Sequence, residues 1–200
     1  MKLFYADASP YARKARVTVA EKGLDAEIDF VSCNPFDEAA SLRAANPLSK
    51  VPTLLLNDGA VLYDSPVICE YLDSLAPTPR LYPASGEARW IALRRQALAD
   101  GVLDAAFAVV VEGRRAEGER SPSWVARWTT AIEHGLDAIE GEVDALPAAI
   151  DIAQIGFGAA LGYLDLRLPD LAWRARRPRA AAWFSAFAER PSMVATRPAG

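Results

Sequence analysis

The segment from Val51 to Pro66, VPTLLLNDGAVLYDSP, restricts the possible folds more than any other part of the chain. Its apolar residues and its Asn57-Asp58-Gly59 turn predict two short strands joined as a β-hairpin. Pro52 has no backbone donor and therefore belongs at the start of the first strand, where the preceding bond can be cis. Such a kink would leave the Val51 backbone outside the sheet and able to pair with another peptide backbone.

An acidic residue and a hydroxyl residue follow the second strand of this hairpin. Asp64 and Ser65 stand just before a predicted amphipathic helix over residues 66–76, in which apolar side chains recur at helical spacing. The backbone N–H groups at the start of a helix favour an anion. A free backbone edge beside a carboxylate pocket indicates a small peptide as the ligand.

The elements before the hairpin predict a βαβ unit. Lys2 to Ala6 is expected to form a first strand, and the alternating residues Glu27 to Val31 a second. Between them, Ser9-Pro10 has the capping hydroxyl and the first-turn proline of a helix start, and Gly23 is typical of a helix end. A short helix near 37–45 then leads to the hairpin.

Only helical patterns follow the proline-rich stretch after residue 76. Helices are expected from Glu87 to Glu112 and from Ser121-Pro122, Asp151 and Pro178 onward. Asp151 and Gln154 fit a capping box, with Gln154 reaching back to the cap N–H, and the helix that they open is apolar enough to be buried. The expected organisation is an α/β domain over 1–76, a linker over 77–86 and an all-α domain over 87–200.

Composition excludes several classes of function. The 200 residues carry 26 acidic and 22 basic side chains, a net charge of −4, which gives no basic surface for nucleic acid or an anionic membrane. The longest uncharged apolar stretch, from Ile155 to Leu164, is too short to span a bilayer. His134 is the only histidine, which rules out His-dependent triads and argues against a zinc site. Cys33 and Cys69 have no ligand spacing and form no disulfide framework, so we expect a cytoplasmic protein.

The chain as a whole resembles the cytosolic glutathione S-transferases, in particular small bacterial members with a serine in the first helix turn. The resemblance is carried by four motifs: Ser9 to Lys14 (SPYARK), Asn46 to Pro52 (NPLSKVP), Asp64 to Pro66 (DSP) and Arg190 to Ser192 (RPS). It implies a thioredoxin-like βαβ-αββα domain followed by a helical bundle. It also implies a homodimer formed through the first two long helices of the second domain.

The resemblance further implies that glutathione, a tripeptide with two carboxylates, an amine and a thiol, is the co-substrate, and that no metal takes part. The thiolate is the nucleophile, yet the free thiol is mostly protonated at neutral pH, so a transferase must lower its pKa. Ser9 can donate its O–H to the sulfur, and its place at a helix start adds a favourable potential. The plainer alternative is that Ser9 serves only as an N-cap.

Four residues of the hairpin segment acquire roles from the same resemblance. Val51, held by a cis Pro52, pairs its backbone with the cysteinyl part of glutathione. Asp64 supplies the countercharge for the γ-glutamyl amine, and Ser65 supplies a hydroxyl and an N–H for the neighbouring carboxylate. The structural alternatives are a trans proline at a strand start and a pair of residues that only cap a helix.

Two further residues complete the expected glutathione site. Lys50 is placed to meet the glycyl carboxylate, although a lysine at this point is exposed by default. Tyr11 brings a second hydroxyl close to Ser9 and is expected to pack beside the site rather than activate the thiol.

The electrophile is expected beside the long helix that begins near Glu87. Asp100, Asp104, Phe107 and Val111 lie on roughly one side of that helix and are candidates to border its pocket. Position 9 holds no cysteine, which disfavours disulfide exchange through an enzyme thiol.

The leading expectation is a glutathione S-transferase that activates the thiol for attack on an apolar electrophile. A glutathione-dependent isomerase or peroxidase would use the same pocket. A third alternative is an interaction protein that keeps the fold without catalysis. The sequence does not choose the electrophile, because loops and helix ends shape its pocket.

Overall fold

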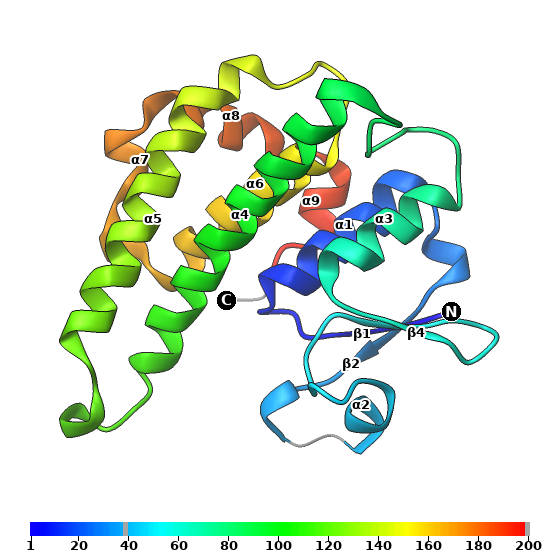
Figure 1. The fold of residues 1–200 in the computed structure, drawn as a ribbon, viewed down its shortest axis with the longest axis horizontal. Helices are drawn as coiled ribbons and strands as arrows, with labels where there is room; N and C mark the ends of the chain where they lie inside the picture. Colours follow the sequence, from blue (N-terminus) through cyan, green and yellow to red (C-terminus); the bar gives the residue numbers. More distant parts are fainter. Residues whose placement is uncertain (38–39, 199–200) are drawn as a thin grey trace.

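The computed structural model describes residues 1–37 and 40–198 and begins with a four-stranded sheet in the order β2-β1-β3-β4 (Figure 1). Its strands are β1 (Lys2–Tyr5), β2 (Asp29–Ser32), β3 (Thr53–Leu55) and β4 (Val61–Leu62). The central strand β1 runs parallel to β2 and antiparallel to β3, so that Leu3 pairs with Phe30 on one side and Leu54 on the other. The β3–β4 hairpin confirms the predicted turn chemistry.

Three helices complete the N-terminal part of the molecule, which we define as β1 to α3. They are α1 (Pro10–Lys22), α2 (Ala40–Ala45) and α3 (Ser65–Ser74). Figure 1 shows α1 and α3 side by side above the sheet, with α2 below it. Helix α1 begins and ends as predicted, because Ser9 caps it and Gly23 takes the left-handed conformation (φ 65°) that glycine adopts without a steric cost.

Several predicted bounds in this part were wrong; for example, β1 ends at Tyr5 rather than Ala6, and α3 covers Ser65–Ser74 rather than 66–76. Strand β2 begins at Asp29 rather than Glu27, because Asp25–Glu27 forms a single 3-10 turn instead of extended chain. Asp37, with which the predicted short helix began, belongs to another 3-10 turn, Pro35–Asp37, and α2 is described over Ala40–Ala45. Residues 38–39, which the prediction placed in the same helix, lie outside the described residues.

The helical part, which we define as α4 to α9, follows without a strand in the stretch 86–198. Its members are α4 (Gly86–Glu112), α5 (Pro122–Glu142), α6 (Ile152–Arg167), α7 (Trp173–Arg176), α8 (Pro178–Phe187) and α9 (Pro191–Ala195). Helices α4 and α5 form a long pair, and α6 lies behind α4 (Figure 1). Within the described ranges, no helix is both long enough and apolar enough to cross a membrane.

The buried helix α6 packs closely against both parts of the molecule. A Cβ at Gly158 would lie 2.6 Å from the ring of Phe187, and one at Gly162 would lie 2.6 Å from the guanidinium of Arg13. Real Cβ contacts are essentially never this short, so the Phe187 ring requires glycine at Gly158, whereas at Gly162 the contact is with the end of the Arg13 side chain. Helix α6 therefore holds α1, and with it the sheet, against the helical part.

The start of α6 departs in one detail from the predicted capping box. Asp151 caps the helix as expected, with its Oδ1 accepting the Gln154 N–H at 3.0 Å. The Gln154 side chain does not reach back to the cap N–H, because its amide nitrogen donates instead to the carbonyls of Pro147 (2.7 Å) and Ala149 (3.1 Å). Both carbonyls belong to the loop that leads into α6 and lie within hydrogen-bonding distance of Gln154. An amide group can donate hydrogen bonds to them, whereas a carboxylate cannot.

The closing Arg190-Pro191-Ser192 motif ties the end of the chain to α1. The Arg190 guanidinium donates two hydrogen bonds to Glu21, at 3.0 and 2.9 Å, and the Ser192 hydroxyl donates a third at 2.5 Å. Burial acts to raise the pKa of Glu21, but the hydrogen bonds from Arg190 and Ser192 lower it overall. The motif is therefore structural, since it holds the last helix on the back of α1.

A buried ion pair joins α1 to α4. Lys14 is fully buried, and its ammonium bonds the carboxylate of Asp100. Burial raises the pKa of Asp100, and the positive charge of Lys14 opposes that rise only in part. Desolvation thus outweighs attraction, as is common for buried ion pairs.

We predict that Asp100→Asn lowers the free energy of unfolding by about 3–5 kcal/mol, because it leaves the Lys14 ammonium buried without a countercharge. The double variant Lys14→Met/Asp100→Leu should lose much less, since it buries no charge. Urea unfolding measures both. Exposed Asp25 provides the matched control Asp25→Asn, with an expected change within about 0.5 kcal/mol. A double variant as unstable as the single one would contradict this interpretation.

Candidate functional site

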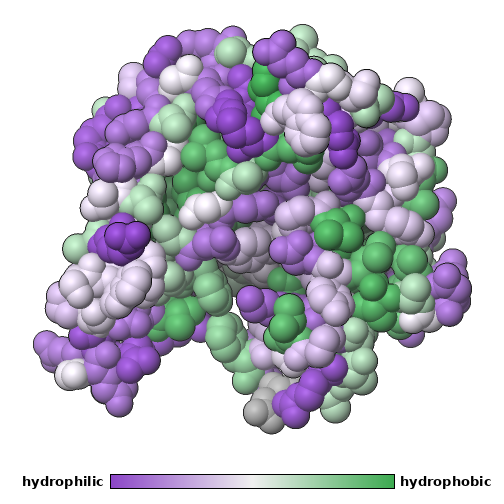
Figure 2. All heavy atoms as spheres, in the orientation of Figure 1, coloured by the Kyte–Doolittle hydropathy of each residue, from purple (hydrophilic) through white to green (hydrophobic). Residues whose placement is uncertain are grey.

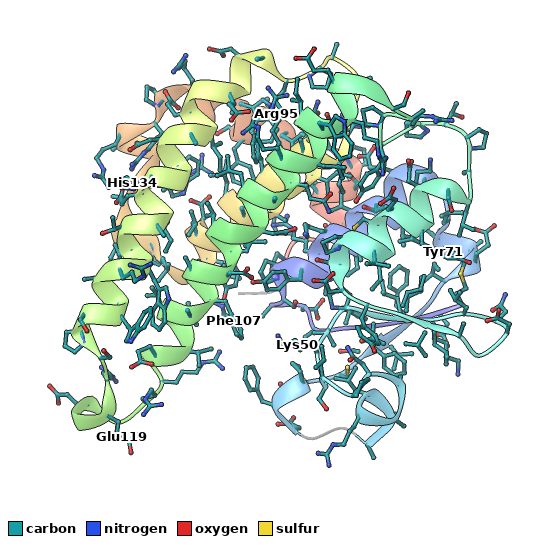
Figure 3. All side chains as sticks on the ribbon, viewed as in Figure 1. Lys50, Tyr71, Arg95, Phe107, Glu119 and His134 are labelled. Carbon is teal, nitrogen blue, oxygen red and sulfur yellow. The ribbon has the colours of Figure 1, made fainter. Side chains whose placement is uncertain are left out.

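A cleft of about 790 Å³ opens between the N-terminal part and the helical part. Figure 2 shows the surface hollowed there, and Figure 3 shows Phe107 and Lys50 on opposite sides of the hollow. The N-terminal wall comes from four short segments: 6–11, 32–36, 46–52 with the exception of Pro47, and 63–65. The opposite wall comes from α4, α6 and the residues just beyond α4: Asp104, Phe107, Arg114, Tyr163 and Arg167.

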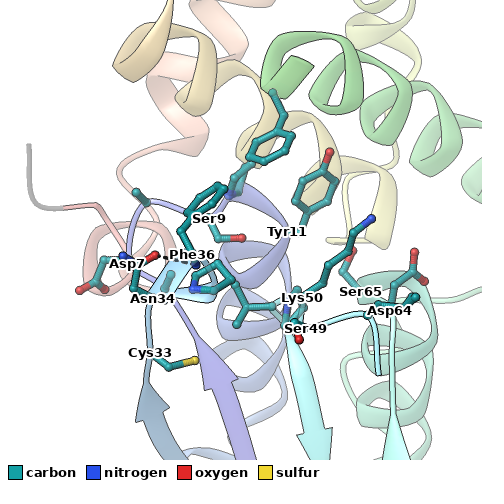
Figure 4. A pocket seen from close by; sticks show the side chains of 18 of the residues that line it. Asp7, Ser9, Tyr11, Cys33, Asn34, Phe36, Ser49, Lys50, Asp64 and Ser65 are labelled. Carbon is teal, nitrogen blue, oxygen red and sulfur yellow. Dashed lines mark hydrogen bonds between the residues drawn. The ribbon is translucent and has the colours of Figure 1, made fainter. Parts of the chain in front are cut away.

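Ser9 stands at the point where α1 meets the cleft (Figure 4). Its Oγ accepts the N–H of Ala12 at 3.2 Å, which makes it the N-cap of α1. That bond uses one lone pair of the hydroxyl, so the hydroxyl hydrogen remains able to donate to another group. The two interpretations of Ser9, as cap and as donor to a ligand, are therefore compatible in one side chain.

Val51 and Pro52 lie on the same wall, directly before β3. The bond between them is cis, as predicted from the sequence. The sheet ladder begins only at Thr53, which pairs with Phe4, so Val51 precedes the paired part of the strand. Val51 is buried, and its side chain joins a small apolar cluster with Phe4 and Leu42.

Asn46 holds the loop that presents Val51 to the cleft. Its amide nitrogen donates to the Lys50 carbonyl (3.2 Å) and to Thr53 Oγ1 (2.9 Å), and its oxygen accepts the Leu48 N–H (2.9 Å). Thr53 Oγ1 also donates to the Lys50 carbonyl at 2.8 Å. From the sequence, Asn46 was identified as part of the Asn46 to Pro52 motif, and this role was missed because it depends on a contact with Thr53, seven residues further along the chain.

Asp64 and Ser65 sit together at the start of α3. Ser65 is buried and Asp64 is exposed, and both line the cleft (Figure 4). Asp64 occupies the N-cap position, but its carboxylate makes no capping hydrogen bond. The acid is therefore available to a cation in the cleft, beside the backbone donors of a helix start.

Lys50 and Tyr11 also line the cleft, but the Lys50 side chain is exposed whereas the Tyr11 hydroxyl is hydrogen-bonded. Lys50 is exposed at the rim. The Tyr11 hydroxyl donates to Asp104 Oδ1 at 2.5 Å, and its pKa is raised, first by burial and then by Asp104. Its proton is thus committed to Asp104 rather than to a group beside Ser9.

The expected electrophile wall is reproduced only in part. Asp104 and Phe107 line the cleft, whereas Asp100 and Val111 are not among its lining residues. Asp100 instead forms the ion pair with Lys14. The other lining residues of this wall are Tyr163, Arg167 and Arg114. Those three were missed because their place depends on how α6 crosses α4, which no local pattern reveals.

Both cysteine thiols ionise less readily than an ordinary thiol, because the pKa of each is raised. Burial raises the pKa of the Cys33 thiol, which lines the cleft, and raises that of buried Cys69 to about 11. Both are therefore weaker nucleophiles than an exposed thiol at neutral pH. In the part of the chain that the structure describes, no three His, Cys, Asp or Glu side chains group as a metal site would require.

Comparisons with known proteins give consistent matches. The family model "Glutathione S-transferase, N-terminal domain" matches residues 8–75, and "Glutathione S-transferase, C-terminal domain" matches residues 122–186. The chain is 31% identical over 201 residues to the uncharacterized GST-like protein YibF of Escherichia coli K12, covering 99% of this chain and 98% of YibF. A stringent starvation protein A homolog of Haemophilus ducreyi is 36% identical over 83 residues, covering 42% of this chain and 37% of that protein.

Solved structures extend the match to the whole fold. A glutathione transferase family member from Pseudomonas fluorescens Pf-5, with bound glutathione, aligns with a TM-score of 0.96 and 42% identity over 100% of this chain and 99% of that chain. The structure of a family member from the same strain with bound S-(propanoic acid)-glutathione aligns with a TM-score of 0.92 and 40% identity over 100% of both chains.

We predict that Asn46→Ala lowers the free energy of unfolding by about 1–3 kcal/mol, because it leaves buried polar groups of the loop without partners. Asn46→Asp should also destabilise, since a carboxylate cannot donate to Lys50 and Thr53. Asn57→Ala, in an exposed turn, is the control. Thermal unfolding measures all three, and an Asn46→Ala protein as stable as the unmodified chain would refute the role of Asn46.

Proposed function

The chain belongs to the glutathione S-transferase family, and from this premise we propose that it binds glutathione in the cleft and activates its thiol for attack on an electrophile. The observation that carries the proposal is the place of Ser9. Its hydroxyl lines the cleft, stands at the start of a thirteen-residue helix and keeps a hydrogen to donate. A donor and a helix N-terminus together favour a thiolate over a thiol.

The N-terminal wall of the cleft offers a partner for each part of the tripeptide. The Val51 backbone, ahead of the sheet ladder, would pair with the cysteinyl residue beside cis Pro52. Asp64 would meet the γ-glutamyl amine, and Ser65 would meet the neighbouring carboxylate. Lys50, at the rim, would meet the glycyl carboxylate.

The residues that line the cleft fit the proposed reaction. The thiol loses its proton to solvent, the sulfur stays hydrogen-bonded to Ser9, and the thiolate attacks an electrophile held near Phe107 and Tyr163. The Tyr11 hydroxyl keeps its proton and donates a hydrogen bond to Asp104, so Tyr11 packs beside the sulfur without taking the place of Ser9. Relatives bind glutathione and S-(propanoic acid)-glutathione, which supports a cleft that holds the tripeptide together with a group on its sulfur.

We also propose a two-fold homodimer through α4 and α5 and a division of the chain at 1–76, 77–86 and 87–200. Large apolar side chains exposed on these helices support the dimer: Trp90, Ile91 and Trp124. Burying such side chains against a second copy removes apolar surface from water.

Two alternatives use the same fold. A glutathione-dependent isomerase or peroxidase would need the same thiolate and differs only in the second substrate. A non-catalytic interaction protein is favoured by one observation, the partial match to a stringent starvation protein A homolog.

Calorimetric titration with glutathione separates these classes. We expect saturable heat and a rise in melting temperature at millimolar glutathione, because a ligand that binds only the folded state stabilises it. The absence of both effects would eliminate the transferase, isomerase and peroxidase proposals together. Binding without turnover of any aryl halide, peroxide or isomerisable substrate would favour the interaction protein.

We predict that Ser9→Ala leaves glutathione affinity largely intact and lowers turnover of a model aryl halide by roughly ten- to a hundredfold, the loss of one hydrogen bond to a charged group. Ser74→Ala is the control, since Ser74 bonds only a carbonyl in its own helix, away from the cleft. Steady-state kinetics with glutathione held at saturation measure the effect. Unchanged turnover would remove Ser9 from the activating role.

A further inference from the structure

Two arginines stand out on the helical wall of the cleft. Arg114, just beyond α4, and Arg167, at the end of α6, both line the cleft and are exposed to it. The arginines of the helical part mostly pair with acids, as Arg94 and Arg95 do with Glu142. Across residues 1–37 and 40–198, neither Arg114 nor Arg167 forms an ion pair.

Two of the three acids among the described lining residues already have a partner. Asp7 pairs with Arg16 at 2.9 Å, and Asp104 accepts the hydroxyl of Tyr11. Asp64 lies at the start of α3, on the N-terminal wall. Among the described lining residues, the acid on the helical wall is Asp104, which accepts the Tyr11 hydroxyl and forms no ion pair with Arg114 or Arg167.

Arg114, Arg167 and Tyr163 line the same cleft. Tyr163 lines the cleft and is buried, and burial raises the pKa of its hydroxyl, while the charges of Arg167 and Arg114 oppose that rise. The helical wall of the cleft thus carries two cationic side chains and a tyrosine.

An aromatic surface adjoins these cations. The Arg114 guanidinium lies 5.2 Å from the centre of the Phe36 ring, and Phe107 borders the same cleft. A guanidinium stacked on a ring keeps its N–H donors in its own plane, where a carboxylate can accept two of them. The helical wall therefore fits a ligand with an apolar body and one acidic group.

We propose that the electrophile of this enzyme carries a carboxylate, which Arg114 and Arg167 bind while its apolar body lies against Phe36 and Phe107. The proposal rests on the proposed transferase function and replaces a purely apolar electrophile with an acidic one. With an aryl chloride, the thiol proton goes to solvent and sulfur bonds the ring carbon. Chloride then leaves with the electron pair of the carbon–chlorine bond.

The experiment compares 4-chloro-3,5-dinitrobenzoate with its uncharged amide, each at saturating glutathione. The kcat/KM of each is divided by its uncatalysed rate constant with glutathione, which removes the difference in intrinsic reactivity. We expect a preference for the acid of roughly tenfold to a hundredfold, the range for hydrogen bonds to a charged group. The preference should shrink as salt screens the charges of the exposed arginines.

Substitutions of the two arginines test whether they cause the preference for the acid over the amide. Arg114→Gln/Arg167→Gln should reduce the acid-to-amide ratio to about one while the amide rate and glutathione affinity change little, as expected for removal of one contact with the substrate. Arg127→Gln, an exposed arginine outside the cleft, should leave the ratio unchanged. The single variants should each give an intermediate ratio.

The experiment distinguishes failure of this inference from failure of the proposed transferase function. Turnover of both substrates without an acid preference would overturn the inference and leave the transferase function standing. A double variant that loses both substrates equally and binds glutathione more weakly by calorimetry would also overturn it, since the arginines would then hold glutathione. No turnover of either substrate would overturn the transferase function and this inference with it.

Discussion

The attachment of α1 to the helical part is the constraint on which the cleft depends. Lys14 and Tyr11, one turn apart on α1, bond Asp100 and Asp104, one turn apart on α4. On another side, Gly162 lets α6 approach Arg13 of the same helix. Because Ser9 caps α1, these contacts also set the distance between its hydroxyl and the side chains of the opposite wall.

The two walls of the cleft are built in different ways. Much of the N-terminal wall is held by local chemistry: a cis bond, a helix cap and the hydrogen bonds of Asn46. The helical wall consists of side chains from α4, α6 and the chain just beyond α4, among them Arg114 and Arg167. A wall of the first kind suits recognition of one constant ligand, and a wall of the second kind can change its specificity by few substitutions.

The same difference explains what the sequence predicts well. Short local motifs predict the structure at three places that line the cleft: Ser9-Pro10, Val51-Pro52 and Asp64-Ser65. Val111, in contrast, does not line the cleft, and the Gln154 side chain donates to loop carbonyls instead of the predicted cap N–H. Those outcomes depend on helix crossing and on competition between nearby carbonyls, which only the folded chain decides. The roles of the lining residues toward glutathione remain predictions.

The ultraviolet absorbance of the glutathione thiolate, followed against pH with the tripeptide bound, tests the role of Ser9 most directly. In the unmodified protein we expect the bound thiol to ionise at a lower pH than free glutathione, because the Ser9 hydroxyl and the start of α1 favour the thiolate. In Ser9→Ala the pKa of the bound thiol should move back toward that of free glutathione. The same titration curve in both proteins would contradict the proposed chemistry of the site.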